Sequence, residues 1–336
     1  LDRQIRARGV GNFLVEFQAV FPLICSMILF ALMSQVGFDS MSTGEFVAFM
    51  IAFGGFLSAS MTISSSLATI MNLVPTYDRL RPILQAAPER QDDFAEPFSL
   101  EGKIQLSGLT FRYDPDGPIV LHDINLTIQA GEFVAFVGPS GSGKSTLFRL
   151  LLGFETPENG KVTYDGRDLS SLDLREVRRQ IGVVMQNAQI MPGDLFTNIV
   201  GLSTNLTMED AWEAARMAGL ADDIEQMPMK LHTIINEGGS TFSGGQRQRL
   251  LIAAAIAKRP RILLFDEATS ALDNQSQAVV SRSLETLQST RVVISHRLST
   301  VVAADRIYVI DRGRIVQSGT NDQLLAEGGL FGELAR

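Results

Sequence analysis

The stretch Gly138-Pro139-Ser140-Gly141-Ser142-Gly143-Lys144-Ser145 decides the fold of this chain, because it has the pattern G-x-x-x-x-G-K-[ST]. It follows an apolar run at 133–137 and precedes a helical pattern that begins at Thr146. Glycines let backbone N–H groups close around an anion, and the N-terminus of a helix adds a favourable dipole. We expect Lys144 to reach the phosphates of a nucleoside triphosphate and the Ser145 hydroxyl to ligate Mg²⁺. A flexible glycine-rich turn is the alternative, but the flanking strand and helix favour a phosphate site.

A second part of the same site follows the apolar run at 262–265, where Asp266 and Glu267 stand side by side. Ligands of open α/β sheets bind at the carboxyl ends of the strands. We expect Asp266 to hold Mg²⁺ directly or through water, and Glu267 to orient or deprotonate the attacking water. Many strands end in solvated acids, so the pair alone is weak evidence for a catalytic site. Together with the phosphate loop it becomes strong evidence.

Apolar runs alternate with helical patterns over most of the chain. Continuous runs, typical of strands buried on both faces, occur at 133–137, 182–185, 262–265, 292–295 and 307–310. Half-exposed strands are predicted at 104–106 and 124–128. These patterns predict an α/β core with a mostly parallel sheet. Between 198 and 257 the strand patterns vanish, and we expect an inserted helical subdomain there.

Composition restricts the class of protein. The chain has 336 residues, which suits two domains, and 45% of them are hydrophobic while 20% are charged. The formal net charge is −8 and there is no long basic run, which argues against a nucleic-acid partner. The single cysteine, Cys25, excludes an intrachain disulfide framework.

The apolar residues concentrate in two segments near the N-terminus, at about 13–36 and 46–74. A helix of about 24 residues extends ~36 Å, which exceeds the ~30 Å of a bilayer core. We therefore expect a transmembrane helical hairpin, with interaction with membrane lipid. A signal peptide does not have two such segments, and a buried soluble hairpin is the remaining alternative.

Charge predicts the orientation of this hairpin. The connection between the segments carries only Asp39 and Glu45, whereas arginines flank the segments on the other side: Arg3, Arg6, Arg8, Arg79 and Arg81. By the positive-inside rule both ends face the cytoplasm. A polar, proline-containing linker is predicted at 81–100. Because the chain starts at Leu1, we expect further membrane helices to precede it in a longer protein.

The stretch Ser243-Gly244-Gly245-Gln246-Arg247 resembles the signature of the ATP-binding cassette (ABC) proteins, with Phe242 where the family usually has Leu. The resemblance implies an ABC ATPase that uses ATP and Mg²⁺. It also implies that the signature acts across a dimer, where it closes over ATP held by the phosphate loop of a second half-transporter subunit. That subunit is either a second copy or a sister chain.

The other family motifs follow in order. Tyr113 matches the aromatic that stacks on adenine, although an aromatic packed on the core is the alternative. Gln186 matches the glutamine that touches Mg²⁺ and the water and faces the membrane domain, Asp273 ends the D-loop 270–273, and His296 matches the switch histidine at the γ-phosphate. The resemblance thus implies that Lys144, Gln186, Glu267 and His296 are catalytic. It assigns the metal to Ser145, Gln186 and Asp266, and nucleotide contacts to residues 138–146.

The exporter branch of the family is favoured by Glu237, which resembles the X-loop, and by the membrane helices that precede the cassette. Residues 79–84 and 211–220 resemble bacteriocin-type peptide exporters of the NHLM/NHLP systems. The resemblance then implies a transmembrane part at 1–80 and an ATP-binding domain at 101–336 in the cytoplasm. The expected function is ATP-driven export of a peptide across the cytoplasmic membrane. Alternatives are export of lipids or drugs, and a soluble ABC ATPase, which would not need the hairpin.

Overall fold

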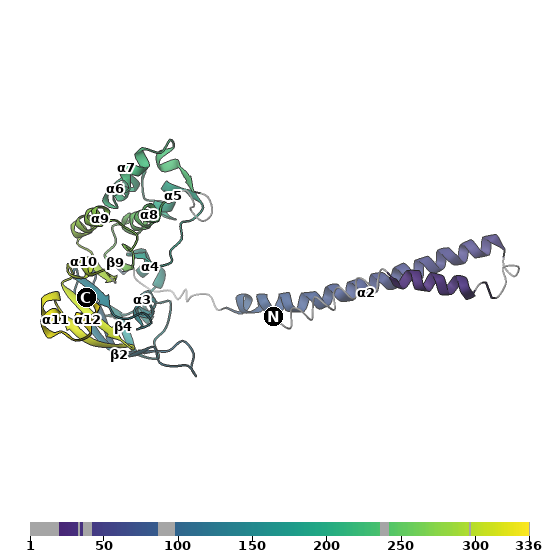
Figure 1. Cartoon of the computed structure of the whole chain (residues 1–336), viewed down its shortest axis with the longest axis horizontal. Coiled ribbons are helices and arrows are strands. Elements are labelled where there is room, and N and C mark those ends of the chain that lie inside the picture. Colours follow the sequence, from purple (N-terminus) through teal and green to yellow (C-terminus); the bar gives the residue numbers. More distant parts are fainter. Residues whose placement is uncertain are drawn as a thin grey trace. The chain divides into compact units, whose positions relative to one another are not determined.

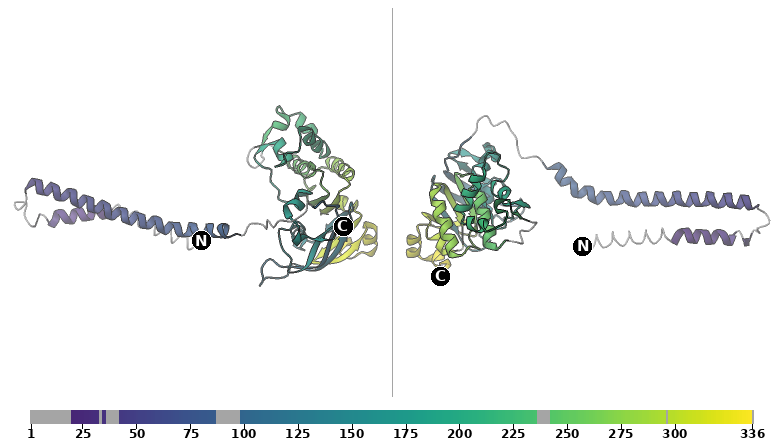
Figure 2. Two further views of the ribbon diagram at one scale, coloured as in Figure 1. Left: turned by 180° about the vertical axis from the view of Figure 1, so that it is seen from behind. Right: turned by 90° about the horizontal axis from the view of Figure 1, so that it is seen from above.

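The computed structural model describes residues 20–32, 34–35, 42–86, 98–235, 242–295 and 297–335. The chain divides into two units, Leu1–Arg90 and Gln91–Arg336. Figures 1 and 2 show the helices of the first unit and the mixed sheets and helices of the second.

The first unit contains the long helix α2 (Thr43–Gln85), whose start is fixed by a capping box. The backbone N–H of Glu45 donates to Ser42 Oγ at 3.3 Å, and the N–H of Ser42 donates to the Glu45 carboxylate at 2.9 Å. A second helix covers Val20–Leu32 and runs in the opposite direction to α2 (Figures 1 and 2). Much of the first predicted segment, including 13–19, lies outside the described residues.

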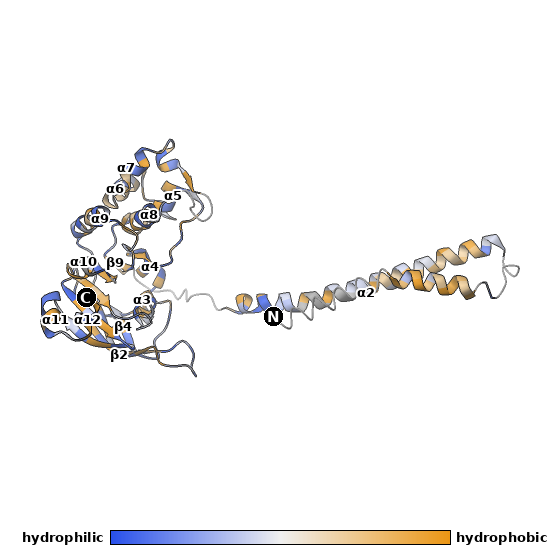
Figure 3. Ribbon diagram, viewed as in Figure 1, coloured by the Kyte–Doolittle hydropathy of each residue, from blue (hydrophilic) through white to orange (hydrophobic). Residues whose placement is uncertain are grey.

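Within the described part of this unit, the 24 residues Thr43–Ser66 are long and apolar enough to cross a bilayer. None of the apolar window in this helix is buried by the rest of the protein. Figure 3 shows that the apolar residues of α2 gather in its first half, near the turn. The helix is longer than the predicted 46–74 and continues through Pro75 and Pro82 to Gln85, five residues into the predicted linker. The change of composition at Arg81 therefore marks the end of the apolar sequence and not the end of the helix.

A six-stranded sheet forms the centre of the second unit, in the order β12-β11-β3-β10-β9-β6. Five strands are parallel to one another: β3 (Phe133–Val137), β6 (Ile181–Val184), β9 (Ile262–Asp266), β10 (Thr290–Ile294) and β11 (Arg306–Asp311). The edge strand β12 (Arg314–Gly319) pairs antiparallel with β11. All residues of β3 and β9 are buried, as their continuous apolar sequences predict.

An antiparallel sheet of order β2-β1-β4-β5 packs beside this centre. It consists of β1 (Ile104–Phe111), β2 (Leu121–Ile128), β4 (Asn159–Tyr164) and β5 (Arg167–Asp168). Helix α3 (Lys144–Leu151) shares one apolar core with β1, β2 and the central strands, and Leu147 and Phe148 have no exposed surface. The phosphate loop therefore sits between two sheets.

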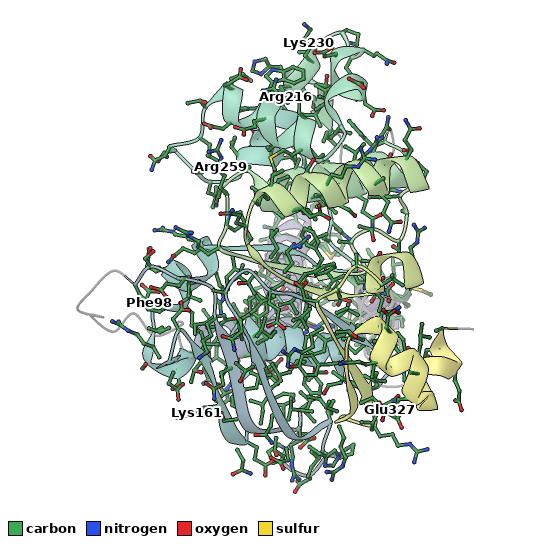
Figure 4. The ribbon with its side chains drawn as sticks, turned by 90° about the vertical axis from the view of Figure 1, so that its left-hand side faces the viewer. Phe98, Lys161, Arg216, Lys230, Arg259 and Glu327 are labelled. Atoms are coloured by element: carbon green, nitrogen blue, oxygen red, sulfur yellow. The ribbon has the colours of Figure 1, made fainter. Side chains whose placement is uncertain are left out.

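The helical subdomain comprises α5 (Leu195–Val200), α6 (Met208–Met217), α7 (Ala221–Glu225) and α8 (Gly244–Ile256). It lies at the opposite end of the unit from β2 (Figure 1), and Figure 4 places Arg216 and Lys230 there and Lys161 on the antiparallel sheet. Within 198–257 the structure also has a two-residue strand, β8 (Ile234–Ile235), which pairs with β7 (Gly193–Asp194). A two-residue strand is too short to show a pattern of its own.

Smaller helices complete the unit. These are α4 (Leu174–Arg179) before β6, α9 (Asn274–Thr286) after β9, α10 (Leu298–Val301) after β10, and α11 (Asn321–Glu327) and α12 (Gly329–Leu334) after β12, together with the 3₁₀ turns Leu169–Ser171 and Lys230–His232.

Candidate nucleotide site

The phosphate loop joins β3 to α3 through three glycines with positive φ: Gly138 at 151°, Gly141 at 77° and Gly143 at 105°. A Cβ at Gly138 would lie 2.0 Å from the carbonyl oxygen of Ile310, so only glycine fits there. At Gly141 a Cβ would meet nothing within 4 Å. The loop is therefore pressed against β11 at its start and open at its middle.

Lys144 lies at the first turn of α3 with 6% of its surface exposed. Its ammonium donates to the carbonyl oxygens of Gly138 at 2.9 Å and Pro139 at 2.8 Å, and to Ser142 Oγ at 3.3 Å. Burial lowers the pKa of Lys144, while the charges of Asp266 and Glu267 act to raise it. The loop thus holds a largely buried cation next to its exposed residues Ser140 and Gly141, and an ammonium in such a loop is suited to binding phosphate.

Asp266 and Glu267 stand where β9 ends. Asp266 is 2% exposed and aligned with Ile294 of β10. Glu267 has φ 54°, and its N–H donates to the carbonyl oxygen of Ile294 at 2.9 Å. The Glu267 carboxylate accepts from the side-chain amide of Gln186 at 3.1 Å, because β6 pairs directly with β9 and brings the two loops together.

The predicted metal ligands form a set of hard oxygen atoms. Ser145 is exposed in the first turn of α3, Asp266 is buried at the end of β9, and Gln186 follows β6. Among the described residues no group of three or more His, Cys, Asp or Glu side chains could hold a metal. A hydroxyl, a carboxylate and an amide oxygen fit Mg²⁺ that is bound together with substrate phosphates, rather than a cage made by the protein.

Tyr113 follows β1 and lies beside the phosphate-loop helix. Its hydroxyl is 3.0 Å from Thr146 Oγ1, and its ring meets Phe111 edge-on with centroids 4.9 Å apart. Tyr113 is 55% exposed. It thus contacts the core and is also accessible from outside, and stacking on adenine stays a prediction.

The signature stretch begins α8. Ser243 Oγ accepts from the N–H of Gln246 at 3.2 Å, and Gln246 Oε1 accepts from the N–H of Ser243 at 3.0 Å, which forms a capping box. Ser243 and Gly244 are exposed and Gly245 is half-buried. Phe242 is only 6% exposed and belongs to the core of the helical subdomain, so an apolar residue other than Leu fits at this position.

Asp273 caps helix α9 within the same chain. Its carboxylate accepts from the N–H and the hydroxyl of Ser276 at 2.9 and 2.8 Å, and these hydrogen bonds lower the pKa of Asp273. The predicted switch histidine His296 and the X-loop residue Glu237 lie outside the described residues.

Residues 121–270 match the family model described as ABC transporter. This region is an ABC transporter ATP-binding domain. The domain is an ATPase and has the P-loop fold of that family. The match covers the phosphate loop, Gln186, the signature and the acid pair.

Three curated relatives extend the comparison of the ATP-binding domain. The exotoxin translocation ATP-binding protein PaxB of Pasteurella aerogenes is 40% identical over 287 residues, which are 85% of this chain and 40% of that protein. The toxin RTX-I translocation ATP-binding protein of Actinobacillus pleuropneumoniae is 39% identical over 295 residues, 87% and 42% of the two chains. The alpha-hemolysin translocation ATP-binding protein HlyB of Escherichia coli is 38% identical over 289 residues, 85% and 41%. The chain thus spans about two-fifths of the relatives that it matches.

Among solved structures, a bacterial Atm1-family ABC exporter with ATP bound matches with a TM-score of 0.74 and 29% identity. The match covers 98% of this chain and 59% of the exporter chain.

Sequence reasoning missed two residues of the ATP-binding domain. Gln248 bonds to the carbonyl oxygen of Glu267 at 3.0 Å and to the N–H of Ala271 at 2.7 Å. Arg297, next to His296, bonds to the carbonyl oxygens of Ser270 at 2.7 Å and Leu272 at 2.9 Å. Gln248 directly follows the motif at 243–247, and polar residues there are common on helices, so only its contacts distinguish it.

Proposed function

We propose that this chain is the ATP-hydrolysing subunit of an ABC exporter that moves a polypeptide across the cytoplasmic membrane. The observation that carries the proposal is the hydrogen bond between Gln186 and Glu267 near the buried Lys144, in a chain that also has an unburied apolar helix. The hydrogen bond supports a role in ATP hydrolysis, and the exposed apolar helix supports a position in a membrane.

The roles of the site residues follow from their positions. Lys144 and the backbone of the loop 138–145, which is exposed at Ser140 and Gly141, bind the phosphates, and Tyr113, which is 55% exposed, provides a surface for the base. Glu267 accepts a proton from the attacking water, and Gln186 holds the Glu267 carboxylate in position. ATP, with Mg²⁺ held by Ser145, Asp266 and Gln186, supplies the phosphoanhydride bond whose cleavage drives the cycle. His296 is proposed as the contact to the γ-phosphate.

The proposal includes a second subunit, and the exposed signature supports it. Ser243 and Gly244 present hydroxyl and amide groups at the start of α8, a helix of 13 residues. These groups complement an anion. In the proposed dimer they close over the ATP held by the phosphate loop of the partner, and Asp273 lies at the seam. A homodimer and a heterodimer both satisfy this geometry.

The hairpin is proposed to lie in the membrane. Thr43–Ser66 extends ~36 Å as a helix, and Phe56, Ile63 and Ile51 are each more than 70% exposed. Arg79 and Arg81 follow this span, and by the positive-inside rule they support a cytoplasmic ATP-binding domain. The proposed divisions are a membrane part at 1–80, a linker at 81–100 and the ATP-binding domain at 101–336.

Membrane association and turnover are tested together on the full chain. After membranes are washed with alkaline carbonate, the protein is expected to stay in the pellet and to be released only by detergent. Reconstituted vesicles are expected to hydrolyse ATP, and Glu267→Gln vesicles are expected to hydrolyse it at least about 100-fold more slowly. A protein that the wash releases fully would support the soluble ABC ATPase instead.

Cargo requires a separate assay. Peptide cargo is favoured by the curated relatives, whose names describe toxin translocation. Inside-out vesicles should accumulate a labelled peptide in an ATP-dependent manner and leave a labelled lipid in its original leaflet. Movement of the lipid without the peptide would overturn the cargo part of the proposal and leave the exporter part intact.

A further inference from the structure

Three backbone groups of the D-loop are held by side chains from two other elements. The N–H of Ala271 donates to Gln248 Oε1 at 2.7 Å, and Gln248 lies on the signature helix α8. The carbonyl oxygens of Ser270 and Leu272 accept from Arg297 at 2.7 and 2.9 Å. Since Arg297 directly follows His296, the D-loop is joined on one side to the signature and on the other to the switch-histidine loop.

The partners of Gln248 determine how its amide is turned. The backbone N–H of Ala271 can only donate, so it requires Oε1, and the backbone carbonyl of Glu267 can only accept, so it requires Nε2 at 3.0 Å. One side chain therefore joins the backbone of the catalytic acid to the backbone of the D-loop.

The Glu267 backbone needs such support. Its φ of 54° is in the left-handed region, which is unfavourable for a residue with a Cβ. It is held by its N–H to Ile294 at 2.9 Å and by its carbonyl oxygen, which accepts from the N–H of Ser270 at 3.1 Å and from Gln248. The direction of the Glu267 side chain toward Gln186 depends on this conformation.

Packing holds only part of the D-loop, at Leu272, which is 3% exposed and lies in a hydrophobic core. Ser270 and Ala271 are exposed, and a cavity of about 380 Å³ is lined by Gln186, Gly244, Gln248 and Ala271. Arg297, by contrast, also bonds to Gln277 Oε1 at 3.0 Å, and Gln277 in turn donates to Thr300 of α10 at 2.9 Å. The exposed part of the D-loop is thus held by polar contacts, and the one from Gln248 would change directly if α8 moved.

We infer that Gln248 and Arg297 are positioning residues that clamp the D-loop, and that Gln248 transmits the position of the signature helix to the Glu267 backbone of its own chain. The inference rests on the proposed function, in which Glu267 acts on water. Closure of a partner against α8 then sets the hydrolytic geometry on the same chain, in addition to any contact across the seam.

The first test is hydrogen exchange on the full chain in detergent, which needs no turnover. Gln248→Leu is expected to accelerate exchange in the D-loop peptide by about 3- to 10-fold, because the N–H of Ala271 loses its acceptor. Gln248→Glu keeps that acceptor and is expected to preserve the protection. The control Gln105→Leu, on an exposed position of β1, is expected to change nothing. Unchanged D-loop exchange in Gln248→Leu would overturn the inference.

The second test separates positioning from general stability. Gln248→Leu and Gln248→Glu both remove the donor to Glu267, and each is expected to lower kcat by about 10-fold or more with KM for ATP within about twofold. In a Glu267→Gln background the same changes are expected to cause no further loss. Arg297→Gln is expected to raise D-loop exchange, with Arg282→Gln on α9 as its control.

The outcomes distinguish this inference from the proposed function. An equal kcat loss in both backgrounds would mean that Gln248 acts without Glu267 and would overturn the inference. If the unchanged chain hydrolysed no ATP, the proposed function would fail, and the exchange of the D-loop would still decide whether the clamp exists.

Discussion

The side-chain amide of Gln186 donates to the carboxylate of Glu267 at 3.1 Å, although the two residues are 81 positions apart. Their contact follows from the pairing of β6 with β9, since each residue lies just beyond the end of its strand. The family resemblance implies that the loop with Gln186 faces the membrane domain. This loop therefore contacts Glu267, the group that acts on water in the proposed function.

We predict that Glu267→Gln keeps nucleotide affinity and lowers ATP turnover by about 100-fold or more, because the water loses its proton acceptor. Binding of a fluorescent nucleotide and the rate of phosphate release check this in vesicles. Glu285→Gln, on the exposed face of α9, serves as the control. Turnover near that of the unchanged chain would remove Glu267 from its role.

Lys144 predicts a pH dependence. Its pKa is lowered in the folded chain by burial, so between the folded and unfolded pKa values the unfolded chain binds more protons. The free energy of unfolding therefore rises with pH in that alkaline window. Phosphate binding requires the charged ammonium, so nucleotide affinity should fall with rising pH sooner than the ordinary lysine pKa implies.

Titration of nucleotide affinity from neutral to alkaline pH checks the Lys144 prediction. Lys144→Met is expected to bind nucleotide weakly at every pH, and Lys161→Met, on the exposed part of β4, is expected to keep the alkaline decrease. An affinity that stays level throughout the alkaline range would contradict the buried position of the ammonium.

Two glycines of the phosphate loop should respond differently to alanine. At Gly138 the new Cβ would lie 2.0 Å from the carbonyl oxygen of Ile310, whereas at Gly141 it has open space. We expect Gly138→Ala to lower the free energy of unfolding by at least about 2 kcal/mol and Gly141→Ala by about 1 kcal/mol, since both have positive φ. Thermal unfolding of the two variants compares them, and equal destabilisation would argue against the contact with β11.

Ser243→Asp separates the two tasks of the signature serine. Aspartate caps a helix as well as serine does, so the thermal stability should be retained. Its negative charge would face the phosphates of the partner's nucleotide, so turnover should be lost while nucleotide still binds to the isolated chain. Loss of nucleotide binding by the single chain would place Ser243 in its own phosphate site and contradict the dimer.

The sequence predicts the structure well where a single short stretch shows a recognisable residue pattern whose chemistry is known. The phosphate loop, the acid pair and the buried strands β3 and β9 have this property, and the parallel sheet follows from their apolar runs. Contacts between distant loops could not be predicted, because the bonds of Gln248 and Arg297 depend on how α8 and the loop after β10 meet the D-loop. The capping roles of Ser243 and Asp273 were likewise hidden, since motif matching assigned those side chains to a partner.

At the end of α2 the sequence predicts a shorter helix than the structure has. Pro75, Pro82 and the polar residues after Arg81 favour a break, and yet the helix continues to Gln85, where Arg81 bonds to Gln85 at 3.3 Å. A local bond of this kind supports a helix that composition alone would end.

The dimer claim is tested most directly by pairing two defective chains, Lys144→Met and Ser243→Asp, that carry different tags and are purified as a mixed pair. Each variant paired with itself is expected to be inactive. In the mixed pair one of the two sites combines an intact Lys144 with an intact Ser243, so ATP turnover should return to roughly half of the unchanged rate. A mixed pair as inactive as either variant alone would contradict a shared site.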